Sequence, residues 1–377
     1  MSAITIRAGL MGKLHEVNWL LPVLVIVLGS IGVAMIFAAT DGVWSQGAQQ
    51  HVIRVMFAGV LMLTVATIHI RLWYHLAYPV YFIALVMLAG VDFVGVSVNG
   101  AQRWFDLGVT RIQPSELMKP GLVLALARYY HDLPEWRVSH IFGLTGALLI
   151  IAIPTQFILR QPDLGTTVLL ATTGVAVIFL AGINWRIITT AALLASIALP
   201  LFYMYGLKDY QRRRIATFIN PESDPMGAGY HIQQSKIALG SGGTSGKGFM
   251  NGTQRQLEYV PENRTDFIFT VIGEEFGLIG GLVTMGLYAL IIGLCMRLAF
   301  QCRYLFSKLL ILGLTTTFAL YVFINLAMVM GLAPVVGVPL PLVSYGGTVT
   351  LTVMLGFGLV LSAHLYRRAE MPREARD

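Results

Sequence analysis

Ten long apolar runs constrain this chain more than any other feature of its sequence. They lie near residues 19–40, 51–69, 76–96, 114–130, 141–159, 164–182, 186–206, 267–298, 308–331 and 344–365. A helix needs about 20 apolar residues to cross a bilayer. Hydrophobic residues make up 56% of the chain and charged residues only 12%, whereas soluble domains carry roughly 25% charged residues. The sequence therefore predicts an all-α polytopic membrane protein with about ten transmembrane helices.

The chain is predicted to form a single membrane domain over residues 1–377, because nothing in it suggests a separate soluble domain; it also shows no internal repeat and no low-complexity segment. The polar segment 207–266, between the seventh and eighth runs, is the one long interruption. The two cysteines, Cys295 and Cys302, support neither a disulfide framework nor a cysteine-based metal site.

Basic residues outnumber acidic ones and give a net charge of +7. In a membrane protein this excess marks cytoplasmic loops, so no nucleic-acid partner is implied. If the N-terminus is cytoplasmic, the short connections on that side hold Arg7, Lys13, Arg71, Arg128, Arg137, Arg186, Arg297, Arg303, Lys308, Arg367, Arg368, Arg373 and Arg376. The short connections opposite hold Arg54, Arg103, Arg111 and Arg160. We therefore expect both termini in the cytoplasm and the loop 207–266 outside it, since long loops cross regardless of their charge.

A carboxylate, Asp266, stands at the mouth of the eighth apolar run, in the stretch Tyr259–Phe269. A charge is costly to keep next to hydrocarbon, so such a residue is a candidate for function. The alternative is structural, with Thr265 or Asp266 capping the helix that follows. The residues alone leave both possibilities open.

Further polar groups stand where more outer helices are expected to begin. Ser115 follows Pro114 and is expected to cap the fourth helix. Glu116 and Lys119 are three residues apart on one helix face, so they can pair. Such a pair either stabilises the first turn or faces a polar cavity, because burying it in an apolar helix is expensive. Asp163, before the sixth run, is likewise either a cap or a functional acid.

The outer segment 207–266 holds several short motifs. Residues 209–215 fit an amphipathic interfacial helix or a solvated basic turn, and residues 232–239 fit a short helix carrying Lys236. The glycine-rich stretch 240–248 departs from the Walker A pattern, so no ATP site is predicted. It could still offer backbone N–H groups to a phosphate, or it could be a flexible connector. Beyond the segment, Glu274 and Glu275 point to different helix faces and cannot both serve one site.

The stretch Pro334–Gly347 is apolar but cannot be a regular helix, because it contains three prolines and repeated glycines. Non-helical backbone at membrane depth is tolerated where protein buries it or where it lines a cavity. We therefore expect a re-entrant or wedged loop, with a simple hydrophobic turn as the alternative.

Three classes of function fit these residues. A transferase acting on a lipid-linked substrate would use the polar groups that gather on the outer side, and it would need a donor that is already activated because no nucleotide motif exists. A transporter or flippase would place charges near the midplane and would usually show a repeat. A scaffold that only binds partner helices would leave the outer carboxylates unexplained.

Several of these motifs resemble one known family, the SEDS proteins (shape, elongation, division and sporulation). The resemblance rests on Val260–Phe269 with Glu274 and Glu275, on Gln113–Lys119, and on Pro334–Gly347, in the family's order. The elongation branch is more similar than the division branch, and the stretches that favour it are Gly100–Gly108, Asp209–Arg212, Asp224–His231 and Gly252–Gln254. The chain departs from the family pattern in Arg264, where a histidine is usual, and in Val349, where a small residue is usual.

The resemblance implies a peptidoglycan glycosyltransferase of the bacterial cytoplasmic membrane that serves elongation and rod shape. Its substrate would be lipid II and its donor the growing glycan on undecaprenyl pyrophosphate, with inversion at the donor anomeric carbon. The implied partners are a class B penicillin-binding protein and other membrane proteins of the elongation machinery. A lipid II flippase or a non-catalytic scaffold of that machinery is the alternative.

The same resemblance assigns roles to residues. Asp266 is the candidate base, since a carboxylate can deprotonate the attacking hydroxyl. Arg103, Lys119 and Lys236 are candidates for the pyrophosphates, and Glu116 and Asp163 would hold the electrostatics of the cavity. No cofactor is evident, although a divalent cation, Mg²⁺ or Mn²⁺, could share the pyrophosphate. The predicted substrate-binding set is Arg103, Gln113, Ser115, Glu116, Lys119, Asp163, Lys236, Ser344 and Tyr345.

Overall fold

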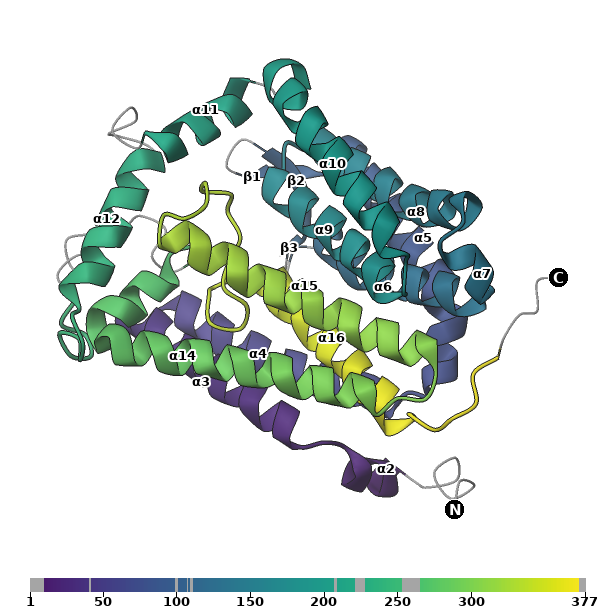
Figure 1. The fold of residues 1–377 in the computed structure, drawn as a ribbon. Helices are drawn as coiled ribbons and strands as arrows, with labels where there is room; N and C mark the ends of the chain where they lie inside the picture. The colour runs from purple at the N-terminus through teal and green to yellow at the C-terminus, as the bar shows by residue number, and fades with distance from the viewer. Residues whose placement is uncertain are drawn as a thin grey trace.

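The computed structural model describes residues 10–40, 42–98, 101–106, 108, 111–206, 209–220, 228–252 and 265–372. Long helices run side by side through the molecule (Figure 1). They are α2 (Leu10–Glu16), α3 (Leu20–Ala38), α4 (Gln46–Thr67), α5 (Ile70–Val94), α6 (Pro114–Asp132), α7 (Glu135–Val138), α8 (Ile141–Arg160), α9 (Leu164–Leu180), α10 (Trp185–Leu201), α11 (Asp209–Ile219), α12 (Ala228–Ser241), α14 (Ile268–Phe300), α15 (Leu305–Val329) and α16 (Gly347–Leu365), with a π-helical turn at Phe202–Gly206.

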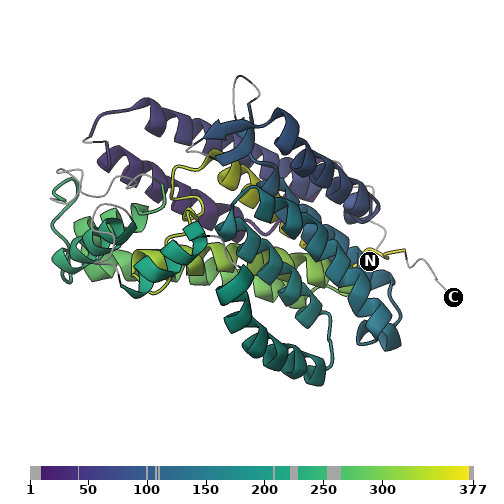
Figure 2. The same ribbon diagram turned by 90° about the horizontal axis from the view of Figure 1, so that it is seen from above.

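Each of the ten predicted apolar runs contains one long helix, and the all-helical polytopic architecture is confirmed. Seven of these helices, α3, α4, α5, α8, α14, α15 and α16, are long and apolar enough to cross a membrane. The remaining three are less regular spans: α9 and α10 have 17 residues each, and α6 carries charged residues. Seen from above, α10 lies at the edge of the bundle, on the side away from α3 and α4 (Figure 2).

The expectation of helices alone misses a small antiparallel sheet between α5 and α6. Its strands are β1 (Val96–Val98), β2 (Ala101–Asp106) and β3 (Arg111–Ile112), in that order across the sheet. Phe105 pairs with Ile112, and the Gln102 amide donates to the Gly95 carbonyl at 2.8 Å. Valine and aromatic residues favour strands, but these strands are too short for the alternation to stand out beside the long apolar runs.

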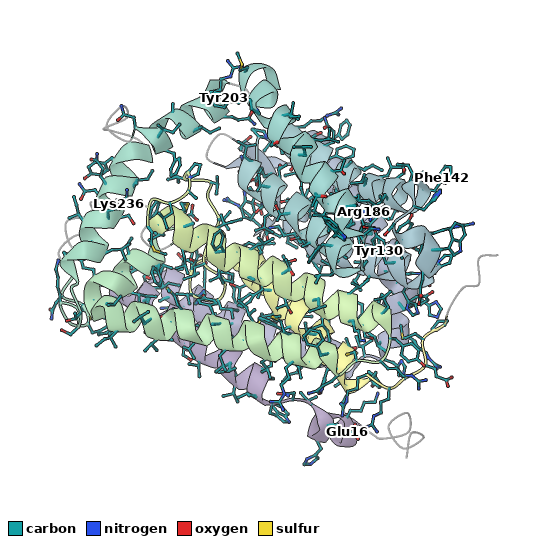
Figure 3. All side chains as sticks on the ribbon, viewed as in Figure 1. Glu16, Tyr130, Phe142, Arg186, Tyr203 and Lys236 are labelled. Atoms are coloured by element: carbon teal, nitrogen blue, oxygen red, sulfur yellow. The ribbon has the colours of Figure 1, made fainter. Side chains whose placement is uncertain are left out.

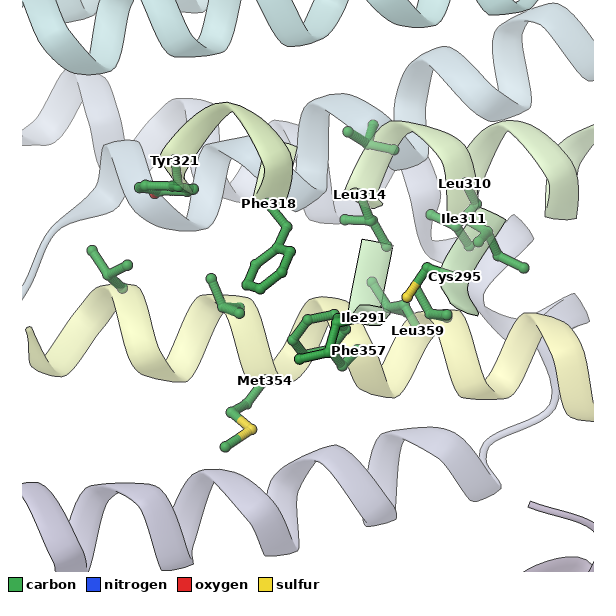
Figure 4. Packing of buried hydrophobic residues seen from close by; sticks show 14 of the residues in the cluster. Ile291, Cys295, Leu310, Ile311, Leu314, Phe318, Tyr321, Met354, Phe357 and Leu359 are labelled. Atoms are coloured by element: carbon green, nitrogen blue, oxygen red, sulfur yellow. The ribbon is translucent and has the colours of Figure 1, made fainter. Parts of the chain in front are cut away.

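The core surrounds α6, which packs against α5, α8, α9, α15 and α16. Nearly every α6 residue from Pro114 to Ala127 is buried, so its polar side chains face protein and not lipid. Aromatic rings fill the neighbouring layer. The ring centre of Phe318 in α15 lies 5.0 Å from that of Phe357 in α16 (Figure 4). It lies 5.7 Å from the ring centre of Tyr288 in α14. Burial inside protein lets α6 carry charged residues that would be costly against lipid, and Glu116, Lys119 and Arg128 make it less apolar than the other runs.

The glycine-rich turn after α12 fills a break in α14. Gly277 has φ +64°, which interrupts the α14 hydrogen-bond ladder. The turn completes that ladder from outside: the Leu278 amide donates to the Gly243 carbonyl at 2.9 Å, and the Gly248 amide donates to the Glu275 carbonyl at 2.9 Å. Lys247 also pairs with the buried Glu274 carboxylate at 2.7 Å. The turn is therefore a structural plug, because broken backbone at membrane depth must find partners within the protein. Neither of the two predictions for it, a phosphate loop or a flexible connector, describes it.

The two ends of the bundle differ. At one end, Lys13 of α2 and Tyr366 after α16 both donate to the Thr67 carbonyl, at 3.5 and 3.0 Å. At the opposite end, α11 and α12 form an arch that leads from α10 to the start of α14 (Figure 1). Asp266 and the small sheet lie at that second end, which we call the outer end of the bundle.

Candidate functional site

The segment 331–346 between α15 and α16 is non-helical at the outer end, and its second half is deeply buried, with Val338 and residues 340–344 inside the protein. Side chains from distant helices satisfy its backbone: Tyr288 donates to the Pro341 carbonyl at 2.6 Å, and Asn325 donates to the Val338 carbonyl at 2.7 Å. His51 contacts the Leu342 carbonyl at 3.1 Å. This is the wedged loop that the prolines and glycines predict, and a simple hydrophobic turn is excluded by its burial. We call residues 331–346 the wedge loop.

Asp266 rests against the wedge loop with its side chain partly exposed. A Cβ placed on Gly337 would lie 3.5 Å from the Asp266 Oδ2 atom, so glycine leaves room for the carboxylate. Asn325 of α15 donates to the Asp266 carbonyl at 2.8 Å. Ser344 donates to the Thr265 carbonyl at 2.6 Å and accepts from the Leu340 amide at 2.8 Å. Two side chains thus fix the backbone on both sides of the residue that carries the carboxylate.

The helices at the outer end differ in how they begin. α14 begins at Ile268 with Phe267 at its N-cap position, so neither Thr265 nor Asp266 occupies the position of the helix cap. Ser115 does not cap α6 either, because Pro114 takes the first helical position, where its missing N–H costs nothing. Asp163 does cap α9, accepting from the Thr166 amide at 3.1 Å.

Arg103 of β2 is held in a polar cluster between α8 and α9. Its guanidinium donates to the Gln161 carbonyl at 2.9 Å and the Pro162 carbonyl at 2.6 Å, and it lies 3.4 Å from the Asp163 carboxylate. Gln113 donates to the same carboxylate at 3.2 Å. The structure therefore brings together three residues of the predicted substrate-binding set, Arg103, Gln113 and Asp163. Their hydrogen bonds, however, are to one another and to the backbone.

Glu116 and Lys119 form a buried ion pair at 2.6 Å, with 3% and 1% of each residue exposed. Tyr321 of α15 completes the cluster, because its hydroxyl contacts both the Glu116 carboxylate and the Lys119 ammonium. A cavity of about 30 Å³ lies beside Lys119 and Tyr321. Lys119 therefore has no open path to a pyrophosphate in this conformation. Tyr321 was missed by sequence reasoning, because nothing local marks a tyrosine in an apolar helix.

Two more cations are better placed at the outer end. Lys236 of α12 is exposed, and its Nζ atom passes 2.8 Å from where a Cβ on Gly331 of the wedge loop would stand. Arg54 of α4 lies 4.8 Å from the centre of the Tyr345 ring. Within the described part of the chain, neither cation pairs with a carboxylate. Sequence reasoning counted Arg54 only for topology, although a lone charged residue in an apolar run is itself a signal of function.

Tyr345 and Arg54 share a partner in Gln50, whose side-chain oxygen accepts from Tyr345 at 2.6 Å and from Arg54 at 3.2 Å. Arg264 and the preceding residues of the Tyr259–Phe269 stretch lie outside the described residues. Within the residues that the structure describes, no three His, Cys, Asp or Glu side chains gather closely enough to hold a metal ion. The described donors therefore do not fit a metal site built by the protein.

These features define a class: a polytopic helical membrane protein with a carboxylate fixed over a buried wedge loop at its outer end. The model of the FtsW/RodA/SpoVE family of cell cycle proteins matches residues 17–369. The peptidoglycan glycosyltransferase MrdB of Escherichia coli (strain K12) is 45% identical over 311 residues, which are 82% of this chain and 83% of that protein. The probable peptidoglycan glycosyltransferase FtsW of Trichlorobacter lovleyi is 34% identical over 361 residues, 93% of each chain.

Solved structures agree with these relatives. The rod shape determining protein RodA of Thermus thermophilus superposes with a TM-score of 0.71 at 28% identity, over 94% of this chain and 98% of that one. A chain of a peptidoglycan synthase complex that coordinates polymerization and crosslinking superposes with a TM-score of 0.83 at 29% identity, over 94% and 99%. The chain belongs to the FtsW/RodA/SpoVE family, the SEDS proteins.

Proposed function

We propose that this chain polymerises lipid II into β-1,4-linked glycan strands for cell elongation, as a peptidoglycan glycosyltransferase of the bacterial cytoplasmic membrane. The observation that carries the proposal is the Asp266 carboxylate, partly exposed at the outer end and held there by Asn325 and Ser344. The family relationship supplies the class of reaction, because its relatives include the peptidoglycan glycosyltransferase MrdB.

Asp266 acts as the general base in this proposal. Its carboxylate removes the proton from the 4-hydroxyl of the acceptor sugar while that oxygen attacks the anomeric carbon of the donor. The bond from that carbon to the undecaprenyl pyrophosphate breaks, and the anomeric configuration inverts. Inversion needs one base and no covalent nucleophile, which suits a single carboxylate whose backbone is fixed on both sides.

Cations stabilise the departing pyrophosphate, since charge that develops on a leaving group is best met by fixed positive groups. The described contacts favour Lys236 and Arg54 for this role, because both stand beside the wedge loop without a carboxylate partner among the described residues. Arg103 and Lys119 instead support the cavity: Arg103 holds the start of α9, and Lys119 neutralises Glu116. Gln113, Ser115 and Tyr345 complete the proposed substrate-binding wall.

Ten helices cross the membrane in this proposal: α3–α6, α8–α10 and α14–α16. Because α6 is buried inside the bundle, its charges avoid lipid, and the shorter α9 can cross where neighbours cover part of it. An even number of spans puts both termini on one side. The positive-inside rule makes that side the cytoplasm, so that Asp266 faces the lipid II headgroup outside.

A class B penicillin-binding protein is the proposed partner, together with other membrane proteins of the elongation machinery. The resemblance to a chain from a complex that couples polymerization to crosslinking supports this partner class. A polymerase that delivers uncrosslinked glycan needs a transpeptidase next to it, which gives the pairing its chemical reason.

The experiment that tests the proposal uses purified protein and labelled lipid II in detergent, where no bilayer exists to be flipped across. Glycan ladders on a gel are the expected product, with a class B penicillin-binding protein added if the chain alone is inactive. Absence of ladders under both conditions would reject polymerisation in favour of a flippase or a scaffold. Lipid II flipping by the same protein in sealed vesicles distinguishes those two.

A further inference from the structure

An open cavity of about 720 Å³ lies at the end of the bundle opposite Asp266. It is framed by the end of α6, by α7, by the turn after α9 and by the turn between α14 and α15. Nothing in the proposed polymerisation uses this end of the molecule. Its polar lining residues are Tyr130, His131, Glu135, Arg303, Tyr304 and Lys308.

The cavity carries a surplus of positive charge that is not neutralised. Arg303 and Lys308 both line it and oppose a single carboxylate, Glu135. Within the described residues neither cation forms an ion pair, although other basic residues at this end do, such as Arg128 with Asp132 at 3.5 Å. Lys308 is half-buried, which restricts its access to bulk water and strengthens its electrostatic attraction to an anionic partner.

Aromatic rings stand beside the two cations. Tyr130 is fully buried in the wall of the cavity, so it supplies packing and its hydroxyl is not open to a ligand. The Arg303 guanidinium lies 5.6 Å from the Tyr304 ring, which orients its charge beside the cavity mouth.

Exposed aromatic side chains place the cavity at the level of lipid headgroups. Trp136 of α7, next to Glu135 in the cavity wall, is 65% exposed, and Phe142 at the start of α8 is 77% exposed. Trp185 at the start of α10 is 67% exposed. Aromatic side chains gather where a membrane protein crosses the headgroup layer. Figure 3 shows Tyr130, Phe142 and Arg186 at this same end of the bundle.

We propose that this cavity binds the phosphate headgroup of an anionic phospholipid. The two cations supply the charge that a phosphate diester needs, and pockets of this volume accept small organic ligands. Basic pockets between membrane helices on the cytoplasmic side are suited to such headgroups. An acidic peptide would meet the same charges, but a cavity ringed by interfacial aromatics is reached by lipid first.

The test measures binding of dioctanoyl-phosphatidylglycerol to the purified full chain in uncharged detergent, by native mass spectrometry. We expect saturable binding of this lipid and none of dioctanoyl-phosphatidylcholine at the same concentrations. The double variant R303Q/K308Q should bind roughly thirty-fold more weakly, and each single variant about five-fold more weakly, from the usual contribution of one basic residue near anionic lipid. R186Q, an exposed cation at the same end that does not line the cavity, is the control and should bind like the wild type.

Equal binding of the two lipids, or wild-type affinity in R303Q/K308Q, overturns the proposal. So does a hexaglutamate peptide that binds the wild type more tightly than the lipid does. If the double variant fails to fold, as judged by its gel-filtration profile, the two single variants decide. The readout is binding and needs no lipid II, so this proposal and the polymerase proposal can fail separately.

Discussion

Replacing Glu116 by alanine should destabilise the protein strongly, because it leaves a cation inside the bundle without its carboxylate. Lys119 is 1% exposed and lies 2.6 Å from Glu116, so bulk water does not reach the ammonium when the carboxylate is removed. Only the Tyr321 hydroxyl, among the described residues, remains within reach of the ammonium. Breaking a buried pair by removing one partner costs about 3–5 kcal/mol, against a total stability of about 5–15 kcal/mol for an ordinary domain.

Removing both charges should cost much less than removing one. In E116L/K119M the buried ammonium is gone, and apolar groups of similar volume replace an ion pair at little or no loss. Tyr321 then keeps an unpaired hydroxyl, which costs about 1–3 kcal/mol. The double variant should therefore be clearly more stable than Glu116→Ala.

The assay is unfolding in mixed micelles by titration with sodium dodecyl sulfate, applied to the wild type, E116L, K119M and E116L/K119M as a double-mutant cycle, with Glu116→Ala measured beside them. A coupling free energy of at least about 2 kcal/mol between Glu116 and Lys119 is expected from these magnitudes. The reasoning is refuted if Glu116→Ala unfolds at the wild-type midpoint, because the pair would then be neither buried nor essential.

Two further substitutions test the outer half of the structure. Gly277→Ala should destabilise the protein by about 2 kcal/mol or more, since φ +64° suits glycine and a Cβ would overlap the Gly246 backbone. The control is Gly286→Ala in the same helix, which should be neutral or stabilising because a Cβ there meets nothing within 4 Å. Equal effects of the two substitutions on stability would contradict the role of the glycine-rich turn as a plug at the α14 break. Asn325→Leu removes the hydrogen bonds to the Asp266 and Val338 carbonyls. It should lower the polymerisation rate by roughly a hundredfold, the effect expected when a reacting group shifts by about 1 Å, with little change in lipid II affinity. A titration of the rate with lipid II separates the loss of rate from a loss of affinity, and a pure loss of affinity would argue that Asn325 contacts substrate instead.

Local signals in the sequence predicted much of this structure. Apolar length identified the runs that became the long helices, and the spacing of three residues between Glu116 and Lys119 predicted their ion pair. The prolines and glycines of 334–347 predicted the wedge loop, because those residues exclude helix wherever they stand. Asp163 was open between a cap and a functional acid, and its contacts show the cap together with a pairing to Arg103.

Contacts between segments far apart in the chain could not be predicted from the sequence. Tyr321 and Glu116 are 205 positions apart, and Asn325 and Asp266 are 59 apart, so no local pattern links them. The glycine-rich turn illustrates the same limit. Its composition fits a connector or a phosphate loop equally well, and only the break at Gly277 on another helix explains it. The sequence also could not show that Lys236 is exposed whereas Lys119 is buried, because burial depends on the packing of the whole bundle.

Polymerisation of lipid II by purified Asp266→Asn, measured as glycan ladders, tests the assignment of the base most directly. Asp106→Asn is the matched control, because this carboxylate also lies near the outer end but is exposed and pairs with Arg111 at 3.3 Å on the surface. Hydrogen bonds from the Gly108 amide and from Arg111 lower the pKa of Asp106, so the control also removes a charged carboxylate. We expect no ladders from Asp266→Asn, although it should remain folded in detergent, and wild-type ladders from Asp106→Asn. Normal ladders from folded Asp266→Asn would contradict the account.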